Sequence, residues 1–167
     1  MYLDNAATTP VRPEVLEAMM PYWRGTFGNP SSHHEVGGQA ATALADARAR
    51  VAAVLGVRTG DVIFTSGGTE GNNLAVKGIA LGAMLARGRR HVVTTGIEHE
   101  SILESVAALE RLHGFDATIL DVDDTGRVSA DAVAAALRED TALVTLGYAN
   151  NETGTVQDVR SIAAVTG

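Results

Sequence analysis

The sequence has 167 residues, of which 46% are hydrophobic, a formal net charge of −7 and no cysteine. This length suffices for one domain with its own core, and the acidic charge argues against nucleic acid as a main partner. Without cysteine, disulfides, thiolate metal sites and a cysteine nucleophile are excluded within the chain.

The N-terminal stretch MYLDNAATTP has no basic segment followed by an apolar one, so it does not resemble a signal peptide. No apolar run approaches the ~20 residues that a membrane-spanning helix needs. These observations predict a cytoplasmic protein with no membrane partner.

Two helices are predicted in the first third of the chain. Residues 13–22 show a helical pattern that is expected to end or kink at Pro21. The turn residues of the segment 25–32 predict a loop. A longer amphipathic helix is predicted over residues 40–55, with Gly56 as its C-terminal stop.

From residue 62 onward, short apolar runs alternate with helical patterns. The predicted strands are residues 62–65, 91–95, 117–122 and 142–148, and a helix follows each of them. The second of these helices is expected to begin near Ser101, in a capping box with Glu104. The alternation indicates the α/β class, a three-layer α/β/α arrangement with a mainly parallel sheet.

We therefore predict two parts: an N-terminal segment with helices over residues 1–60 that packs on a large domain, and an incomplete α/β domain over residues 61–167. The last helix has only one or two turns before Gly167. A parallel sheet is normally covered on both faces, so the final layer is expected to be unfinished.

Polar, flexible turns follow three of the four predicted strands, namely residues 66–69, 98–100 and 150–152. Ligands of open α/β sheets bind at such strand ends. The Ser-Gly-Gly-Thr turn suits a phosphate, because glycines allow close approach and a helix N-terminus offers N–H groups. A tight turn in which Thr69 caps its own helix explains this pattern equally well. The spacing matches neither the P-loop nor G-x-G-x-x-G, which favours a small cofactor over a nucleotide.

Five segments of the chain form a distinctive set, namely YLDNAATTP (2–10), GNPSSHHEVG (28–37), FTSGGTEGNNLAVKG (64–78), IEHES (97–101) and ANNETGTVQDV (149–159). Together they resemble the N-terminal part of the cysteine desulfurase family, in the class V aminotransferase group of pyridoxal phosphate enzymes with fold type I. Their order and spacing are those of the family.

The resemblance implies a site for pyridoxal 5'-phosphate (PLP). Gly68 and Thr69 match the pair that holds the cofactor phosphate. His99 matches the histidine that stacks on the pyridine ring and takes part in proton transfer, and Asn151 matches the asparagine that hydrogen-bonds the phenolic oxygen. An imidazole and a carboxamide suit these roles chemically.

The resemblance also implies a substrate and partners. Asn5, Ala7 and Thr8 lie in a segment that resembles the one beside the substrate, L-cysteine. The family converts L-cysteine to L-alanine and passes sulfur to acceptors in iron–sulfur cluster or thiolated-RNA synthesis. A sulfur-acceptor or scaffold protein and a homodimer are therefore expected.

Three functional residues of the family have no counterpart in these 167 residues: the Schiff-base lysine, the aspartate at the pyridine nitrogen and the mobile-loop cysteine. Lys77, the single lysine, lies ~12 Å along the helix that would hold the phosphate, so it cannot replace the Schiff-base lysine. We expect it to be an exposed helix residue.

The absence of these three residues leaves two alternatives open. The first is another enzyme of the same fold, a selenocysteine lyase or another class V aminotransferase. The second is a non-catalytic product, such as a truncated reading frame, a split subunit or an interaction fragment.

Metal sites are less well supported. The zinc motif H-E-x-x-H begins at His99, but Leu103 stands in place of its second histidine. Residues 121–126 imitate a calcium loop, but Ala132 replaces the required glutamate, which favours a solvated turn.

Other histidines are interpreted as structural. His33 and His34 are expected in loop structure or in contacts to substrate. His91 and His113 have no partners in sequence, which favours surface or capping roles.

Overall fold

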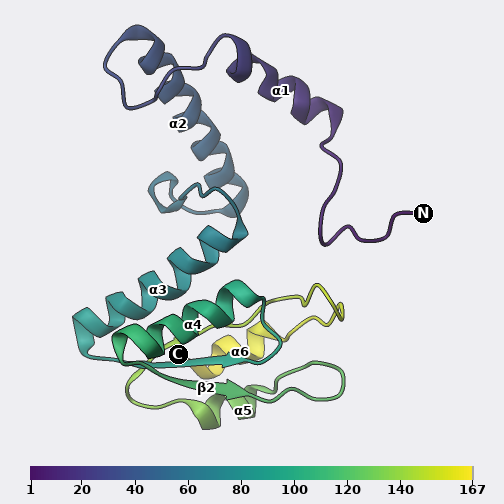
Figure 1. Ribbon diagram of the computed structural model, residues 1–167, viewed down its shortest axis with the longest axis vertical. Helices are drawn as coiled ribbons and strands as arrows, with labels where there is room; N and C mark the ends of the chain where they lie inside the picture. Colours follow the sequence, from purple (N-terminus) through teal and green to yellow (C-terminus); the bar gives the residue numbers. More distant parts are fainter. Residues whose placement is uncertain (167) are drawn as a thin grey trace. The chain divides into compact units, whose positions relative to one another are not determined.

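The computed structural model describes residues 1–166, and contacts divide the chain into two compact units, Met1–Phe64 and Thr65–Gly167. Figure 1 shows the elements of each unit along the chain. Within the described residues, none of the helices combines the length and the apolar character needed to cross a bilayer.

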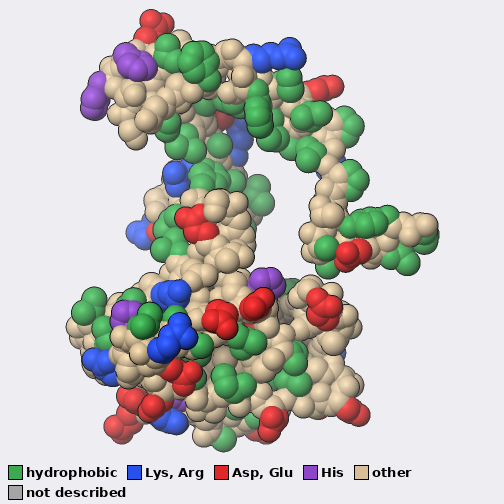
Figure 2. Space-filling view, viewed as in Figure 1, with side chains coloured by type: hydrophobic (Ala, Val, Ile, Leu, Met, Phe, Trp, Pro, Cys, Tyr) green, Lys and Arg blue, Asp and Glu red, His purple; other side chains and the backbone are tan. Residues whose placement is uncertain are grey.

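The first unit contains α1 (Pro13–Arg24), α2 (Glu35–Leu55) and a short 3₁₀ helix, η1 (Thr59–Asp61). The sequence predicts that the first helix ends or kinks at Pro21. The predicted end is wrong, because α1 continues through Pro21 to Arg24. A proline this close to the C-terminus of a helix removes only one hydrogen bond of the helix. Hydrophobic side chains lie on the surface of α1 (Figure 2), and none of its residues is buried.

Helix α2 begins five residues before the predicted start. The His34 side chain caps it, since Nδ1 accepts a hydrogen bond from the Gly37 N–H at 3.2 Å. The helix ends at Gly56 as predicted, with that glycine in the left-handed conformation at φ 68°. His34 therefore belongs to loop and helix structure, one of its two predicted roles.

The second unit alternates helices and strands. Its elements are α3 (Gly68–Arg87), β1 (His91–Thr95), α4 (Glu100–His113), β2 (Asp116–Leu120), α5 (Ala130–Ala136), β3 (Thr141–Val144) and α6 (Val159–Thr166). The three strands form a parallel sheet in the order β2-β1-β3, with Val93 paired to Thr118 on one side and to Val144 on the other.

The predicted strand over residues 62–65 is wrong. These residues form no strand pairing in the part of the chain that the structure describes, and Ile63 and Phe64 are exposed. Both edges of β1 are already occupied by β2 and β3, so this apolar run has no place beside the central strand. The strands β2 and β3 also end earlier than predicted, at Leu120 and Val144.

Two hydrophobic clusters cover the two faces of the sheet, as the predicted α/β/α layers require. One joins the sheet to α3 and α4 and contains Val76, Ala80, Val92, Ile102, Val106, Leu109 and Phe115. The other joins it to α5 and α6 and contains Val128, Val133 and Ile162. In Figure 1, α4 and α5 lie on opposite sides of β2.

His91 is completely buried in the central strand, so its predicted surface or capping role is wrong. Its Nδ1 lies 2.8 Å from the Thr141 hydroxyl of β3, and its Nε2 lies 2.8 Å from the Thr118 hydroxyl of β2. The side chain thus connects all three strands. Burial lowers the pKa of His91, and the positive charge of Arg138 adds to this effect. His113 is exposed at the end of α4, as predicted.

Candidate functional site

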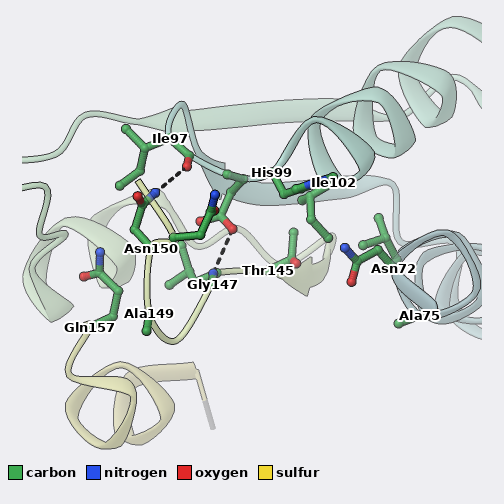
Figure 3. A pocket seen from close by; sticks show the side chains of 14 residues that line it. Asn72, Ala75, Ile97, His99, Ile102, Thr145, Gly147, Ala149, Asn150 and Gln157 are labelled. Atoms are coloured by element: carbon green, nitrogen blue, oxygen red, sulfur yellow. Dashed lines mark hydrogen bonds between the residues drawn. The ribbon is translucent and has the colours of Figure 1, made fainter. Parts of the chain in front are cut away.

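A cavity of about 260 Å³ lies beyond the carboxyl ends of β1 and β3. Figure 3 shows its lining, with Asn72 and Ala75 from α3 on one side and Asn150 and Gln157 on the other. His99 reaches it from the loop between β1 and α4. This is the position at which open α/β sheets bind ligands.

Glu98 connects the loop after β1 to the loop after β3 by hydrogen bonds. One carboxylate oxygen accepts a hydrogen bond from the Thr95 hydroxyl, and the other accepts one from the Gly147 N–H, both at 2.8 Å. A Cβ on Gly147 would lie 3.1 Å from this carboxylate, so a glycine permits the close approach. Glu98 therefore sets the shape of the cavity.

The two neighbouring asparagines have different surroundings. Asn150 donates to the Ile97 carbonyl at 2.9 Å (Figure 3), and its Oδ1 accepts from the N–H groups of Glu152 and Thr153 at 2.9 Å. Asn151 is exposed, and its amide donates only to the Glu152 carboxylate, at 2.7 Å. Asn150 thus builds the loop, whereas Asn151 keeps hydrogen-bonding capacity for a ligand. Asparagine is favoured at the start of such turns because its side chain accepts from N–H groups two or three residues further on, and Asn150, the first asparagine of N-N-E-T-G, occupies this position.

His99 is the N-cap of α4, so the predicted capping box at Ser101 is wrong. The His99 Nδ1 accepts a hydrogen bond from the Ser101 N–H at 3.0 Å. Ser101 is buried in the first turn of the helix, where its hydroxyl contacts His99 and Asn72 instead of capping. The cap was missed because histidine is not among the usual N-cap residues.

The N-terminus of α3 is open. Its N-cap is Gly67, which has no side chain to cap the helix, and Thr69 is already the second residue of α3, so the alternative in which Thr69 caps this helix is wrong. Within residues 1–166, the N–H groups of Gly68, Thr69 and Glu70 have no hydrogen-bond acceptor. A Cβ added at Gly67 or Gly68 would meet nothing within 4 Å. These unpaired donors at a helix N-terminus fit a phosphate group.

The predicted cofactor residues are only partly brought together. His99 and Asn151 line the same cavity, and His99 also lines a shallow depression together with Thr69. Gly68 lines neither of these two hollows. His99 is therefore the residue common to both.

The predicted substrate residues belong to the first unit. Residues 5–7 form a turn, in which the N–H groups of Ala7 and Thr8 donate to the Asp4 carbonyl at 3.2 and 3.4 Å. Asn5, Ala7 and Thr8 are all exposed. Their role in binding L-cysteine stays a prediction.

Lys77 is half-buried, so the expectation that it is exposed is wrong. Its ammonium donates to the Asn73 side chain at 2.6 Å, and Asn73 in turn donates to the Thr69 carbonyl at 2.9 Å. The lysine is thereby held along α3.

The segment 121–126 forms a turn, as predicted. One Asp123 carboxylate oxygen accepts hydrogen bonds from the N–H groups of Arg127 and Thr125 at 2.9 Å and from the Thr125 hydroxyl at 2.7 Å. These bonds, from Arg127 first, lower the pKa of Asp123. Across the described chain, no three His, Cys, Asp or Glu residues form a group that could hold a metal ion.

The comparisons with known proteins agree with this fold. The model of the aminotransferase class-V family matches residues 1–166, and the chain belongs to that family. Its curated relatives include the protein named cysteine desulfurase IscS in Dictyoglomus turgidum, 46% identical over 165 residues, which are 99% of this chain and 41% of the relative. An IscS-type protein of Bacillus subtilis (strain 168) is 52% identical over 162 residues, 97% of this chain and 42% of the relative.

Solved structures show the same similarity. A NifS-like protein superposes with a TM-score of 0.91 at 38% identity, over 99% of this chain and 44% of the other. The structure of SspA in complex with cysteine gives a TM-score of 0.90 at 40% identity, over 99% of this chain and 47% of the other. The chain thus spans about two fifths of the length of the curated relatives that it matches.

Proposed function

We propose that this chain is part of a PLP-dependent cysteine desulfurase, which converts L-cysteine to L-alanine and transfers the sulfur to an acceptor. The observation that carries the proposal is the 46–52% identity to IscS-type relatives over nearly the whole chain. The cavity beside His99 and the open N-terminus of α3 support it, because they offer the polar groups that the family uses.

The cofactor would be held by the chain's own polar groups. The N–H groups at the start of α3 and the Thr69 hydroxyl would bind the phosphate, the His99 imidazole would stack on the ring, and the Asn151 amide would donate to the phenolic oxygen. PLP supplies an electron sink for reactions at the α-carbon of an amino acid. The chain contributes binding, orientation and hydrogen-bond donors.

The sulfur-accepting and Schiff-base groups are not supplied by these residues. The sequence contains no cysteine, and its single lysine is held by Asn73 on α3. In the proposed enzyme both groups lie outside residues 1–167. By the same resemblance we propose a homodimer that delivers sulfur to an acceptor or scaffold protein, and from its sequence we propose that it is cytoplasmic.

The test is turnover by the protein expressed from its full reading frame with PLP. L-Cysteine is expected to yield alanine and sulfide in equal amounts in the presence of a thiol reductant. Alanine from L-selenocysteine alone would support the lyase alternative. No alanine from either substrate, in protein that retains bound PLP, would contradict both.

The non-catalytic alternative needs a separate measurement on the chain of residues 1–167. With PLP and borohydride, we expect no stable adduct in its mass spectrum, because Lys77 is engaged with Asn73. An adduct at Lys77 would contradict the assignment of the Schiff-base lysine to a position outside this chain.

A further inference from the structure

One ring nitrogen of His99 faces hydrogen-bond donors. Its Nδ1 accepts from the Ser101 N–H at 3.0 Å and lies 2.8 Å from the Ser101 hydroxyl oxygen. A backbone N–H can only donate, so Nδ1 must present a lone pair. The neutral ring in this arrangement therefore carries its proton on Nε2.

Asn72 determines the direction of the Ser101 hydroxyl. The Asn72 amide, from α3, donates to the Ser101 oxygen at 2.8 Å, and Ser101 is only 7% exposed. This bond uses the hydroxyl oxygen as an acceptor and leaves its hydrogen for the His99 Nδ1. Two donors thus converge on Nδ1, and one of them, the Ser101 hydroxyl, is oriented by a residue 29 positions earlier in the chain.

We propose that Asn72 and Ser101 are positioning residues that fix His99 as the tautomer protonated on Nε2. The inference rests on the proposed function, because it defines which group His99 presents to a ligand in the cavity. Nε2 has no hydrogen-bond partner in the described chain, so its N–H remains available as a donor. A proton taken up by the neutral ring must go to Nδ1, where it opposes the Ser101 N–H and breaks the cap of α4.

The decisive variant is Asn72→Asp, which keeps the shape of the side chain and replaces its donor with an acceptor. The Ser101 hydroxyl then donates its hydrogen to the new carboxylate. A lone pair of the Ser101 oxygen, rather than its hydrogen, then faces the His99 Nδ1. Asn73→Asp is the matched control, since it places the same charge one residue along α3. Asn73 lines the depression beside His99, but its side chain contacts Thr69 and Lys77, and within residues 1–166 it makes no hydrogen bond to Ser101.

The measurement is ¹⁵N NMR of histidine-labelled protein from the full reading frame, without cofactor or substrate. The sample is held at about pH 8.5, where an ordinary imidazole is neutral. The His99 signals are assigned by their loss in His99→Gln. Glu100 and Glu104, which share the depression with His99, are unchanged in every sample.

We expect the unsubstituted protein to show an unprotonated Nδ1 and a protonated Nε2. Asn72→Asp should shift the ratio of the two tautomers toward Nδ1–H by about fivefold, the value of one hydrogen bond, and Asn73→Asp should leave the ratio unchanged. Ser101→Ala removes only the hydroxyl and should give a smaller shift in the same direction.

Equal spectra for Asn72→Asp and Asn73→Asp would overturn the proposal, as would a protonated Nδ1 in the unsubstituted protein. If Asn72→Asp does not fold, an unchanged tautomer ratio in Ser101→Ala would also overturn it. Because the readout involves no turnover, its failure is distinct from a failure of the proposed enzyme activity.

Discussion

Adjacent residues of the same type, Asn150 and Asn151, have different surroundings at the edge of the cavity. The Asn150 side chain pairs with one carbonyl and two N–H groups of the surrounding loops, whereas in the described residues the Asn151 amide donates to Glu152 alone. Their substitution should therefore separate the structure of the loop from the proposed binding of a ligand.

Asn150→Ala should lower the free energy of unfolding by about 2 kcal/mol, because it leaves three backbone groups without their partner. Asn151→Ala should change the free energy of unfolding by less than about 0.5 kcal/mol and weaken PLP binding by about fivefold. Chemical denaturation without PLP and a PLP titration measure the two effects. Equal losses of stability in both variants would contradict the assignment.

A second neighbouring pair, Gly37 and Gly38 in α2, differs in the space around the α-carbon. A Cβ on Gly37 would lie 2.3 Å from the Ser32 carbonyl oxygen and 2.7 Å from the Ser32 Cβ, whereas a Cβ on Gly38 would meet nothing within 4 Å. The loop before α2 thus requires glycine at the first position alone.

We expect Gly37→Ala to destabilise the first unit by about 1–3 kcal/mol through overpacking. Gly38→Ala should stabilise it by about 0.5–1 kcal/mol, because alanine loses less conformational entropy in a helix than glycine does. Urea unfolding followed by far-UV circular dichroism compares the two. A stabilising Gly37→Ala would show that the loop can move away from α2.

At the scale of elements, His91 joins β1 to both neighbouring strands while it is neutral. Burial depresses the pKa of His91 in the folded protein, whereas an unfolded histidine titrates near about 6.5. Below that pH the histidine of the unfolded chain binds a proton, whereas His91 of the folded chain binds it only at a lower pH. Stability is therefore fully present above about pH 6.5 and is lost as the pH falls toward the folded pKa.

The expected result is a decline in the urea midpoint as the pH is lowered from about 6.5 to 5.5, and this decline should be reduced in His91→Gln. His113→Gln is the control, because His113 is exposed and its variant should keep the full pH dependence. If His91→Gln shows the same decline as the unsubstituted protein, another group causes it.

The elements of the second unit were largely predictable, because their apolar periodicity matches the faces that they bury. The absence of a strand at 62–65 was not, since strand formation depends on pairing with residues distant in the sequence, which the sequence does not show. The buried state of His91 depends on two threonines, each at least 27 residues away. The turns of the candidate site were predicted because they depend on local residue types. The roles of Asn72 and Glu98 were not, because they depend on contacts with residues distant in the sequence.

At the scale of the whole chain, apolar burial is unevenly distributed. Both hydrophobic clusters lie in the second unit, where every residue of β1 is buried. Helix α1 has no buried residue, and its Trp23 is 74% exposed. Local stability follows buried apolar contacts, so the two regions should open with very different free energies.

Hydrogen exchange on the chain of residues 1–167 tests this difference. The amides of β1 should exchange at least about a hundredfold more slowly than those of α1, with α4 close to β1 because Val106 and Leu109 are buried. Exchange in α1 as slow as in β1 would mean that its apolar face is covered. If that protection grows with protein concentration, a second copy of the chain covers it, as expected of a homodimer whose interface includes this helix.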